Sequence, residues 1–344
     1  MRKMSRRNFL SDSLLFLGST LVLPVNLTTK KESTVSKYKD SAEEYPSYIK
    51  LERTGELSKR VKKLYEFYES CTLCPRDCRV NRTKGQIGKC QASSKVKVSS
   101  AHPHFGEETP LVGQRGSGTI FFSNCGLRCI YCQNYQISIE GEGAEILDQR
   151  LAEAMIKIQK MGCHNINLVT PTHYVPNIVC AVQKAIPMGL QIPLVYNTGG
   201  YEKLETLQLL EGVVDIYLPD CKYMEPEKAA KYSSEAYNYP HYVKIALKEM
   251  YRQVGDLQVD NRGVAIRGLI IRHLVLPNRI AGTEKFCKFV AENLSKTTCL
   301  NIMRQYRPEY KAVDFPEIAR RITRKEYAEA ITWAKENGLV RLST

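Results

Sequence analysis

One stretch decides the fold of this 344-residue chain: Ser123-Asn-Cys-Gly-Leu-Arg-Cys-Ile-Tyr-Cys-Gln-Asn134. It places Cys125, Cys129 and Cys132 in a C-x3-C-x2-C spacing, directly after strand-forming residues at 119–123. Thiolates are soft ligands that suit iron–sulfur clusters. A cubane cluster has four irons, so three thiolates would leave one iron free to bind a small molecule. Structural zinc requires four ligands, and no fourth cysteine or histidine follows within the loop. The spacing therefore favours a cluster that can act catalytically.

Two longer sequence segments surround these cysteines: Gly116-Ser-Gly-Thr-Ile-Phe-Phe-Ser123 and Tyr131-Cys-Gln-Asn-Tyr-Gln-Ile-Ser138. Together with the cysteine spacing and the aromatic residue before the last cysteine, they resemble the radical S-adenosylmethionine (SAM) enzymes. The likeness is to the homologues of pyruvate formate-lyase activating enzyme, and it runs from about Cys71 to the C-terminus. It implies that the three cysteines hold a [4Fe-4S] cluster whose free iron is chelated by SAM.

The resemblance also implies a reaction and its partners. Reduction of the cluster would cleave SAM to methionine and a 5′-deoxyadenosyl radical, which abstracts hydrogen from a substrate. The implied partners are a one-electron reductant, such as an acidic flavodoxin or ferredoxin, and a glycyl-radical protein as the substrate. A second cysteine-rich segment and an apparent export signal, described below, both weaken a simple activating-enzyme assignment.

Strand and helix patterns alternate from Gly116 to the C-terminus. Strands are predicted at 119–123, 165–170, 192–197, 213–218, 264–276 and 300–303, and helices at 143–161, 176–186, 204–210, 284–293 and 318–337. Repeating β–α units of this kind imply a parallel sheet. The predicted fold class is therefore α/β, and six such strands fit the partial (β/α)6 barrel of radical SAM proteins.

Functional side chains of α/β barrels gather at the carboxyl ends of the strands. Three residues there are candidate SAM contacts. Thr170, which stands where many radical SAM proteins have a Gly-Gly-Glu motif, would accept from the SAM ammonium. Asn197 would contact the ribose or the carboxylate. His273 is either a SAM contact or a satisfied core histidine, and Asp220 and Lys222 either pair with each other or meet a substrate. The other strand-end residues are Pro171, Thr172, His173, Thr198, Gly199, Gly200, Arg272, Gln305 and Tyr306.

A second cysteine group precedes the first strand. Cys71, Cys74, Cys78 and Cys90 have the spacing C-x2-C-x3-C-x11-C, and four thiolates can close a coordination sphere. Structural zinc and an auxiliary iron–sulfur cluster both require four thiolates, so the spacing leaves the two open. Gly85 and Gly88 are expected to allow the tight turns that bring the last cysteine back.

The remaining cysteines and a histidine pair have weaker signals. Five cysteines lie scattered in apolar surroundings and are interpreted as small buried hydrophobes: Cys163, Cys180, Cys221, Cys287 and Cys299. His102 and His104 share one face of an extended segment, and with Glu107 and Glu108 they could form a metal or acid–base site. A His-x-His pair in such a segment is more often structural.

The N-terminus suggests export. Ser5-Arg-Arg-Asn-Phe-Leu10 resembles a twin-arginine signal, and the apolar stretch 14–24 is too short to span a bilayer comfortably. We expect a signal or apolar segment at 1–25, a linker at 26–50, a cysteine-rich metal-binding segment at 51–112 with a helix over 48–69, and the barrel at 113–344. Export would place the protein in the periplasm or at the membrane. SAM and low-potential reductants are cytoplasmic, so a cytoplasmic location is the alternative: the signal is vestigial, or it anchors the enzyme facing inward, or the chemistry differs from that of the family.

The net charge of +14 is dispersed along the chain rather than gathered into an aromatic-studded block, so nucleic acid is not indicated. Two other functions fit the cysteines. A non-catalytic iron–sulfur protein would carry electrons without a SAM pocket, and a zinc-ordered module would bind a partner. Formation of 5′-deoxyadenosine and metal analysis distinguish the three.

Overall fold

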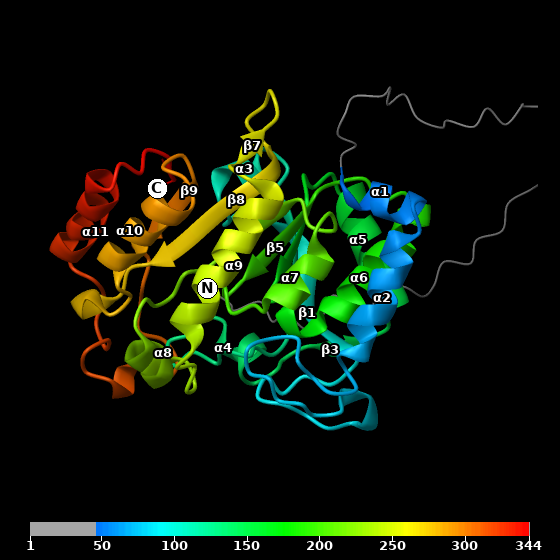
Figure 1. Ribbon diagram of the computed structural model, residues 1–344, viewed down its shortest axis with the longest axis horizontal. Coiled ribbons are helices and arrows are strands. Elements are labelled where there is room, and N and C mark those ends of the chain that lie inside the picture. The colour runs from blue at the N-terminus through cyan, green and yellow to red at the C-terminus, as the bar shows by residue number, and fades with distance from the viewer. Residues whose placement is uncertain (1–45, 344) are drawn as a thin grey trace, which may run out of the picture. The chain divides into compact units, whose positions relative to one another are not determined.

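The parallel strands of the sheet carry the candidate site. The computed structural model describes residues 46–343 and builds them around a mixed β-sheet flanked by helices (Figure 1). Six strands run parallel in the order β2-β4-β5-β6-β8-β9. They are β2 (Ser117–Phe122), β4 (Ile166–Val169), β5 (Leu194–Thr198), β6 (Ile216–Pro219), β8 (Ala265–Leu274) and β9 (Cys299–Met303). All six predicted strands are confirmed, and the α/β class with them.

Antiparallel strands extend the predicted parallel sheet. β1 (Val96–His104) pairs antiparallel with β2, and β3 (Ala144–Ile146) pairs antiparallel with β1. β7 (Gln258–Val259) runs antiparallel to β8, and β10 (Leu342–Ser343) runs parallel to β9. The sheet is therefore mixed. The periodic β–α pattern could not reveal this, because pairing of β1 and β3 depends on residues far apart in the chain.

Helices connect the parallel strands and cover the sheet. They are α5 (Asp148–Lys160), α6 (Val175–Ala185), α7 (Leu204–Leu210), α9 (Tyr239–Val254), α10 (Thr283–Asn293) and α11 (Arg324–Glu336), with the shorter α3 (Thr109–Val112), α4 (Tyr135–Ser138) and α8 (Pro226–Tyr232). Single turns of 3-10 helix are η2 (Arg82–Lys84), η3 (Thr172–Tyr174), η4 (Ile186–Met188), η5 (Pro277–Arg279) and η6 (Ala312–Asp314). The helices predicted at 176–186, 204–210 and 284–293 are confirmed.

Two predicted helices begin later than expected. The helix predicted at 143–161 begins only at Asp148, because residues 144–146 form β3. The helix predicted from 318 begins at Arg324, where Thr323 and Glu326 form a reciprocal capping box. Such a box satisfies the free N–H groups of the first turn and so fixes where a helix starts.

The segment predicted as one helix over 48–69 is two helices. α1 (Tyr48–Arg53) and α2 (Glu56–Glu66) are separated by Gly55, whose φ is 71°. Glycine adopts this left-handed conformation without a steric penalty, and it ends the helical path. The last residues of the predicted linker, from Tyr48, are already helical.

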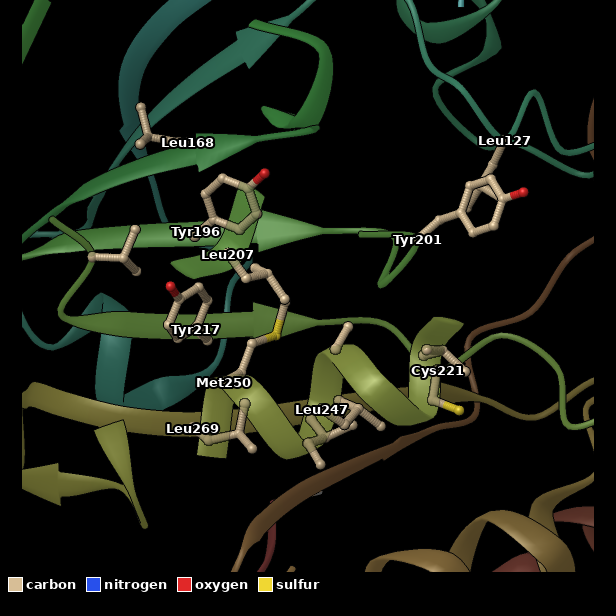
Figure 2. Close-up of a cluster of buried hydrophobic side chains, with 14 of the residues drawn as sticks. Leu127, Leu168, Tyr196, Tyr201, Leu207, Tyr217, Cys221, Leu247, Met250 and Leu269 are labelled. Atoms are coloured by element: carbon tan, nitrogen blue, oxygen red, sulfur yellow. The ribbon is translucent and has the colours of Figure 1, made fainter. Parts of the chain in front are cut away.

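A row of side chains across four strands forms the core beside α9. Register aligns Leu168 with Tyr196, Tyr196 with Tyr217, and Tyr217 with Leu269. Figure 2 shows this row facing side chains from α9, including Met250. These side chains are at most 1% exposed. Burial of the leucine and methionine side chains contributes roughly 1.5–3 kcal/mol each, so this layer helps to fix the register of the four strands.

The described residues were compared with the predicted N-terminal export and membrane segments. Among the described residues, no helix is long and apolar enough to cross a membrane. The twin-arginine motif, the apolar stretch and most of the linker, which were predicted within residues 1–45, lie outside the described residues.

Candidate metal centre

The Cys125–Cys132 loop directly follows β2, as the sequence predicts. Asn124 and Arg128 have φ values of 74° and 48° and turn the backbone at both sides of Cys125. Asparagine tolerates this left-handed region better than most residues. The loop therefore starts at the carboxyl end of a parallel strand, where the functional groups of α/β folds gather.

Each sulfur of this loop has a polar neighbour. The Leu127 amide donates to Cys125 Sγ over 3.4 Å. Cys129 Sγ lies 3.0 Å from the Ser233 hydroxyl, and Cys132 Sγ lies 3.0 Å from the Ser138 hydroxyl. Hydrogen bonds from N–H and O–H groups stabilise thiolate sulfur and tune any bound cluster. Neither serine was singled out from the sequence, because Ser233 lies 104 residues from its sulfur.

Burial disfavours the thiolate form of Cys129 and Cys132. It raises the pKa of Cys129 to about 12, although the Lys222 ammonium opposes the shift. Burial also raises the pKa of Cys132, and the bond to Ser138 opposes that shift. A metal binds thiolates and displaces their protons. All three donors are sulfur atoms with hydrogen-bond partners, one of them buried and two half-buried, and this set fits a thiophilic metal.

The four N-terminal cysteines line one pocket. Cys71, Cys74, Cys78 and Cys90 face it together, with Arg82 beside them. The fold of this segment also depends on Gly88, because a Cβ there would meet Cys78 Sγ at 2.9 Å. Gly85 has the expected turn conformation, with φ 78°, whereas Gly88 provides close approach rather than a left-handed turn.

The two cysteine groups meet at a shared cavity. It is lined by Cys74 and Cys90 from the N-terminal group, by Cys125, and by strand-end residues that include Thr170 and Tyr201. Thr170 has φ 59°, an outlier for a β-branched side chain. Its amide donates to the Asn197 carbonyl over 2.8 Å, which joins the ends of β4 and β5. Outliers of this kind persist where the surrounding structure over-determines them, often at functional sites.

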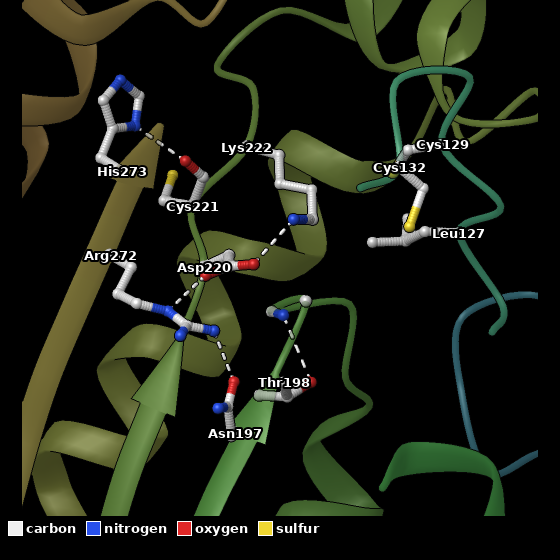
Figure 3. Close-up of polar contacts among 12 residues, drawn as sticks. Leu127, Cys129, Cys132, Asn197, Thr198, Asp220, Cys221, Lys222, Arg272 and His273 are labelled. Atoms are coloured by element: carbon white, nitrogen blue, oxygen red, sulfur yellow. Dashed lines mark hydrogen bonds and ion pairs between the residues drawn. The ribbon is translucent and has the colours of Figure 1, made fainter. Parts of the chain in front are cut away.

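A row of ion pairs crosses the strand ends beside this loop (Figure 3). Arg272 Nε donates to Asp220 over 2.7 Å, and Lys222 Nζ donates to the other oxygen of Asp220, also over 2.7 Å. Arg272 also donates to Glu107 over 3.3 Å and to the Asn197 side-chain oxygen. Burial would raise the pKa of Asp220, but the two cations hold it below its usual value. The predicted pairing of Asp220 with Lys222 is present.

His273 lies in the core next to this row. Its Nδ1 donates to the Cys221 carbonyl over 2.7 Å, and its Nε2 lies 2.9 Å from the Thr283 hydroxyl. The ring stacks on Phe286 at 4.4 Å, and burial lowers the pKa of His273 to about 4. Both ring nitrogens of this neutral histidine are occupied. A SAM contact stays a prediction for Thr170, Asn197 and His273. Of the three, Thr170 is the one that lines the shared cavity with Cys125.

The histidine pair on β1 faces an aromatic side chain. The rings of His102 and His104 lie 5.9 and 6.1 Å from that of Phe121. Glu107 hydrogen-bonds Arg272, and Glu108 accepts from Asn301 over 2.9 Å. These contacts favour the structural interpretation of the pair over an acid–base site.

The side chains of the two cysteine groups are not arranged as a complete metal-coordination site. Within residues 46–343, no three His, Cys, Asp or Glu side chains converge closely enough to hold a metal ion as they are oriented. Both metal centres therefore stay predictions, supported by the gathering of the thiols at two adjoining pockets.

No protein-family model matches this chain. Its sequence is 33% identical over 282 residues to the uncharacterized protein MJ0674 of Methanocaldococcus jannaschii. The alignment covers 79% of this chain and 76% of that protein. The chain belongs to the MJ0674 family. Because this relative is uncharacterized, membership assigns no reaction.

Two further residues of the site were missed by the sequence analysis, besides Ser138 and Ser233. Arg82 is buried beside the N-terminal thiols, and its only sequence signal is its place between Cys78 and Cys90. Glu202 is fully buried beneath the shared cavity. It accepts from Thr172 over 2.6 Å and from Thr198, and burial raises its pKa to about 7. Glu202 ends the Thr-Gly-Gly-Tyr-Glu segment at the end of β5, but nothing in this segment predicts that the Glu202 side chain is buried.

Proposed function

We propose that this chain is a radical SAM enzyme with the partial (β/α)6 barrel of that superfamily. One observation carries the proposal: the three-cysteine loop ends β2 and shares a cavity with the ends of β4 and β5. Six parallel strands in chain order supply the required framework. Cys125, Cys129 and Cys132 would hold a [4Fe-4S] cluster. When bound, this cluster supplies the electron that cleaves SAM to methionine and a 5′-deoxyadenosyl radical.

The chain's own residues would bind and orient SAM. Thr170 lies at the cavity, where its hydroxyl or carbonyl can accept from the SAM ammonium. Lys222 would supply a partly buried positive charge near the loop, and this charge opposes the rise in the pKa of Cys129 that burial causes. Asp220 fixes the Lys222 ammonium in place. Asn197 would contact the ribose or carboxylate of SAM beside the ion-pair row, whereas the two occupied ring nitrogens of His273 favour its role as a core histidine.

The likeness to activating enzymes suggests the other partners. An acidic flavodoxin or ferredoxin would donate the electron to this basic protein, which carries a net charge of +14. A glycyl-radical protein would be the substrate. The four N-terminal cysteines would bind a second metal, as zinc or an iron–sulfur cluster.

The test is anaerobic SAM cleavage. Reconstituted protein, reduced with dithionite and given SAM, is expected to form 5′-deoxyadenosine. Cys129→Ala should abolish the product. Cys180→Ala, which removes a partly exposed thiol on α6, should retain it. Iron and sulfide without any 5′-deoxyadenosine would instead indicate an electron carrier, and zinc without iron would indicate a zinc-ordered module.

Export is tested separately. Residues 1–45 are fused to a folded reporter, and Arg6-Arg7 is replaced by two lysines. We expect the fusion to be exported and the double replacement to abolish export. A reporter whose location is the same with and without the arginine pair would remove the twin-arginine proposal.

A further inference from the structure

Arg82 is a buried cation that lies beside the N-terminal thiols. The residue is 1% exposed. Its Nη1 donates to the His173 carbonyl over 2.6 Å, and its Nη2 donates to the Ser93 carbonyl. Its charge also lies 4.1 Å from the centre of the Tyr68 ring. Among the described residues, Arg82 forms no ion pair with an aspartate or glutamate. Burying a cation is strongly unfavourable unless it is paired.

One nitrogen of this guanidinium has no hydrogen-bond partner among the described residues. This nitrogen, Nε, is buried. Buried N–H groups are almost always satisfied, so an orphaned one calls for an explanation such as an unseen ion. Arg82 lines the same pocket as Cys71, Cys74, Cys78 and Cys90. The Nε donor and the guanidinium charge therefore both lie at the four-cysteine pocket.

We propose that Arg82 is the counter-cation of an anionic metal–tetrathiolate site formed by Cys71, Cys74, Cys78 and Cys90, and that its Nε–H donates to a sulfur of this site. The inference rests on the metal binding proposed above for these cysteines. Four neutral thiols offer no negative charge. A zinc ion or a [4Fe-4S] cluster bound by four thiolates carries excess negative charge in either case.

Arg82 also connects this pocket to the other cysteine loop. The carbonyl that accepts from Nη1 belongs to His173, which lines both cavities. The His173 ring in turn donates to the Ser123 carbonyl over 2.8 Å, two residues before Cys125. A hydrogen-bonded path thus runs from the N-terminal pocket to the end of β2. The hydrogen bonds of Arg82 also hold these segments together. The test must therefore separate the effect of its charge from the effect of its hydrogen bonds.

The experiment isolates the N-terminal site in the full-length chain. The background is the triple variant Cys125→Ala, Cys129→Ala and Cys132→Ala, in which only the N-terminal group can bind metal. Iron, sulfide and zinc are measured after anaerobic reconstitution, and metal affinity is measured by chelator competition. Arg82→Met removes the charge at similar size, and Arg82→Lys keeps the charge but loses the forked donors.

We expect Arg82→Met to weaken metal binding by about 10–100-fold, the usual effect of losing a partner of the ligands. We expect Arg82→Lys to recover most of that loss. If iron is bound, the reduction potential should fall in the methionine variant and stay near that of the parent in the lysine variant, because a nearby positive charge favours the more negative reduced state. If zinc is bound, affinity alone reports the effect.

Three outcomes would overturn the inference. The first is unchanged affinity and potential in Arg82→Met. The second is equal loss in the lysine and methionine variants with reduced thermal stability in both, which indicates that Arg82 acts through its hydrogen bonds alone. The third is a parent triple variant that takes up neither iron nor zinc. SAM cleavage by the chain with all its cysteines is a separate measurement, so failure at this site is distinguishable from failure of the proposed reaction.

Discussion

Replacing Asp220 by asparagine tests whether the ion-pair row stabilises the strand ends. Asp220 accepts from two cations, Arg272 and Lys222, each over 2.7 Å. At an effective dielectric constant of about 20, each pair gains roughly 6 kcal/mol of Coulomb energy before desolvation is subtracted. All three side chains are less than a fifth exposed. Breaking a buried pair on one side typically costs about 3–5 kcal/mol. Lys222 would lose its carboxylate partner, whereas Arg272 would keep its contact with Glu107.

We therefore expect Asp220→Asn to lower the free energy of unfolding by about 3–5 kcal/mol at pH 7. The asparagine amide can still accept one hydrogen bond, but the two cations then repel each other. Urea denaturation followed by circular dichroism measures the change. Glu153→Gln is the matched control, since Glu153 pairs with Arg150 over 2.7 Å on the exposed side of α5. The control should leave the unfolding midpoint unchanged.

The stabilisation that Asp220 contributes depends on pH. The folded pKa of Asp220 is below its ordinary value, so its stabilisation is present above the unfolded pKa of about 4 and is lost as pH falls through the folded value. The difference in stability between wild type and Asp220→Asn should shrink below about pH 4. A difference of under about 1 kcal/mol at pH 7 would refute the reasoning, since that is the size of an exposed pair.

Three further changes test other parts of the site. The wild type should lose on the order of 3 kcal/mol of stability between about pH 4.5 and 7, because the raised folded pKa of Glu202, about 7, makes its ionisation unfavourable in the fold. Glu202→Gln should remove this loss. The free energies of unfolding of the two proteins, measured by urea denaturation, should therefore diverge as pH rises, and a constant difference between them would contradict this. Gly88→Ala should deplete metal from the N-terminal group, since its Cβ would meet Cys78 Sγ at 2.9 Å; Gly126→Ala, with its nearest sulfur at 3.9 Å, should not. Thr170→Val keeps the β-branched shape and should raise KM for SAM about 10–100-fold if the hydroxyl bonds the ammonium; an unchanged KM would remove that contact.

The arrangement of the parallel strands could be predicted from local signals. Each strand is a short apolar run, each helix shows a 3.6-residue pattern, and both patterns depend on neighbouring residues only. The cysteine spacing likewise identified Cys125, Cys129 and Cys132, because ligands of one loop are close in sequence. The capping box at Thr323 was also present in the sequence, and it fixes the true start of α11.

The environment of those ligands was decided by tertiary structure. Cys129 meets Ser233 across 104 residues, and Arg272 meets Glu107 across 165. The burial of Arg82 and Glu202 likewise depends on segments packed over them from elsewhere in the chain. Composition cannot show whether a charged residue faces water or a pocket, because that depends on long-range packing rather than on its neighbours in sequence.

The sequence by itself determined which residues could bind metal, since ligand chemistry and spacing are local properties. Only the tertiary structure decided that the two cysteine groups adjoin one cavity, with Cys74 and Cys90 facing the same space as Cys125. It also decided that His273 is held on both ring nitrogens within the core. The physical reason is the same in both cases: convergence and burial follow from how strands and helices pack, and packing joins residues that the sequence keeps apart.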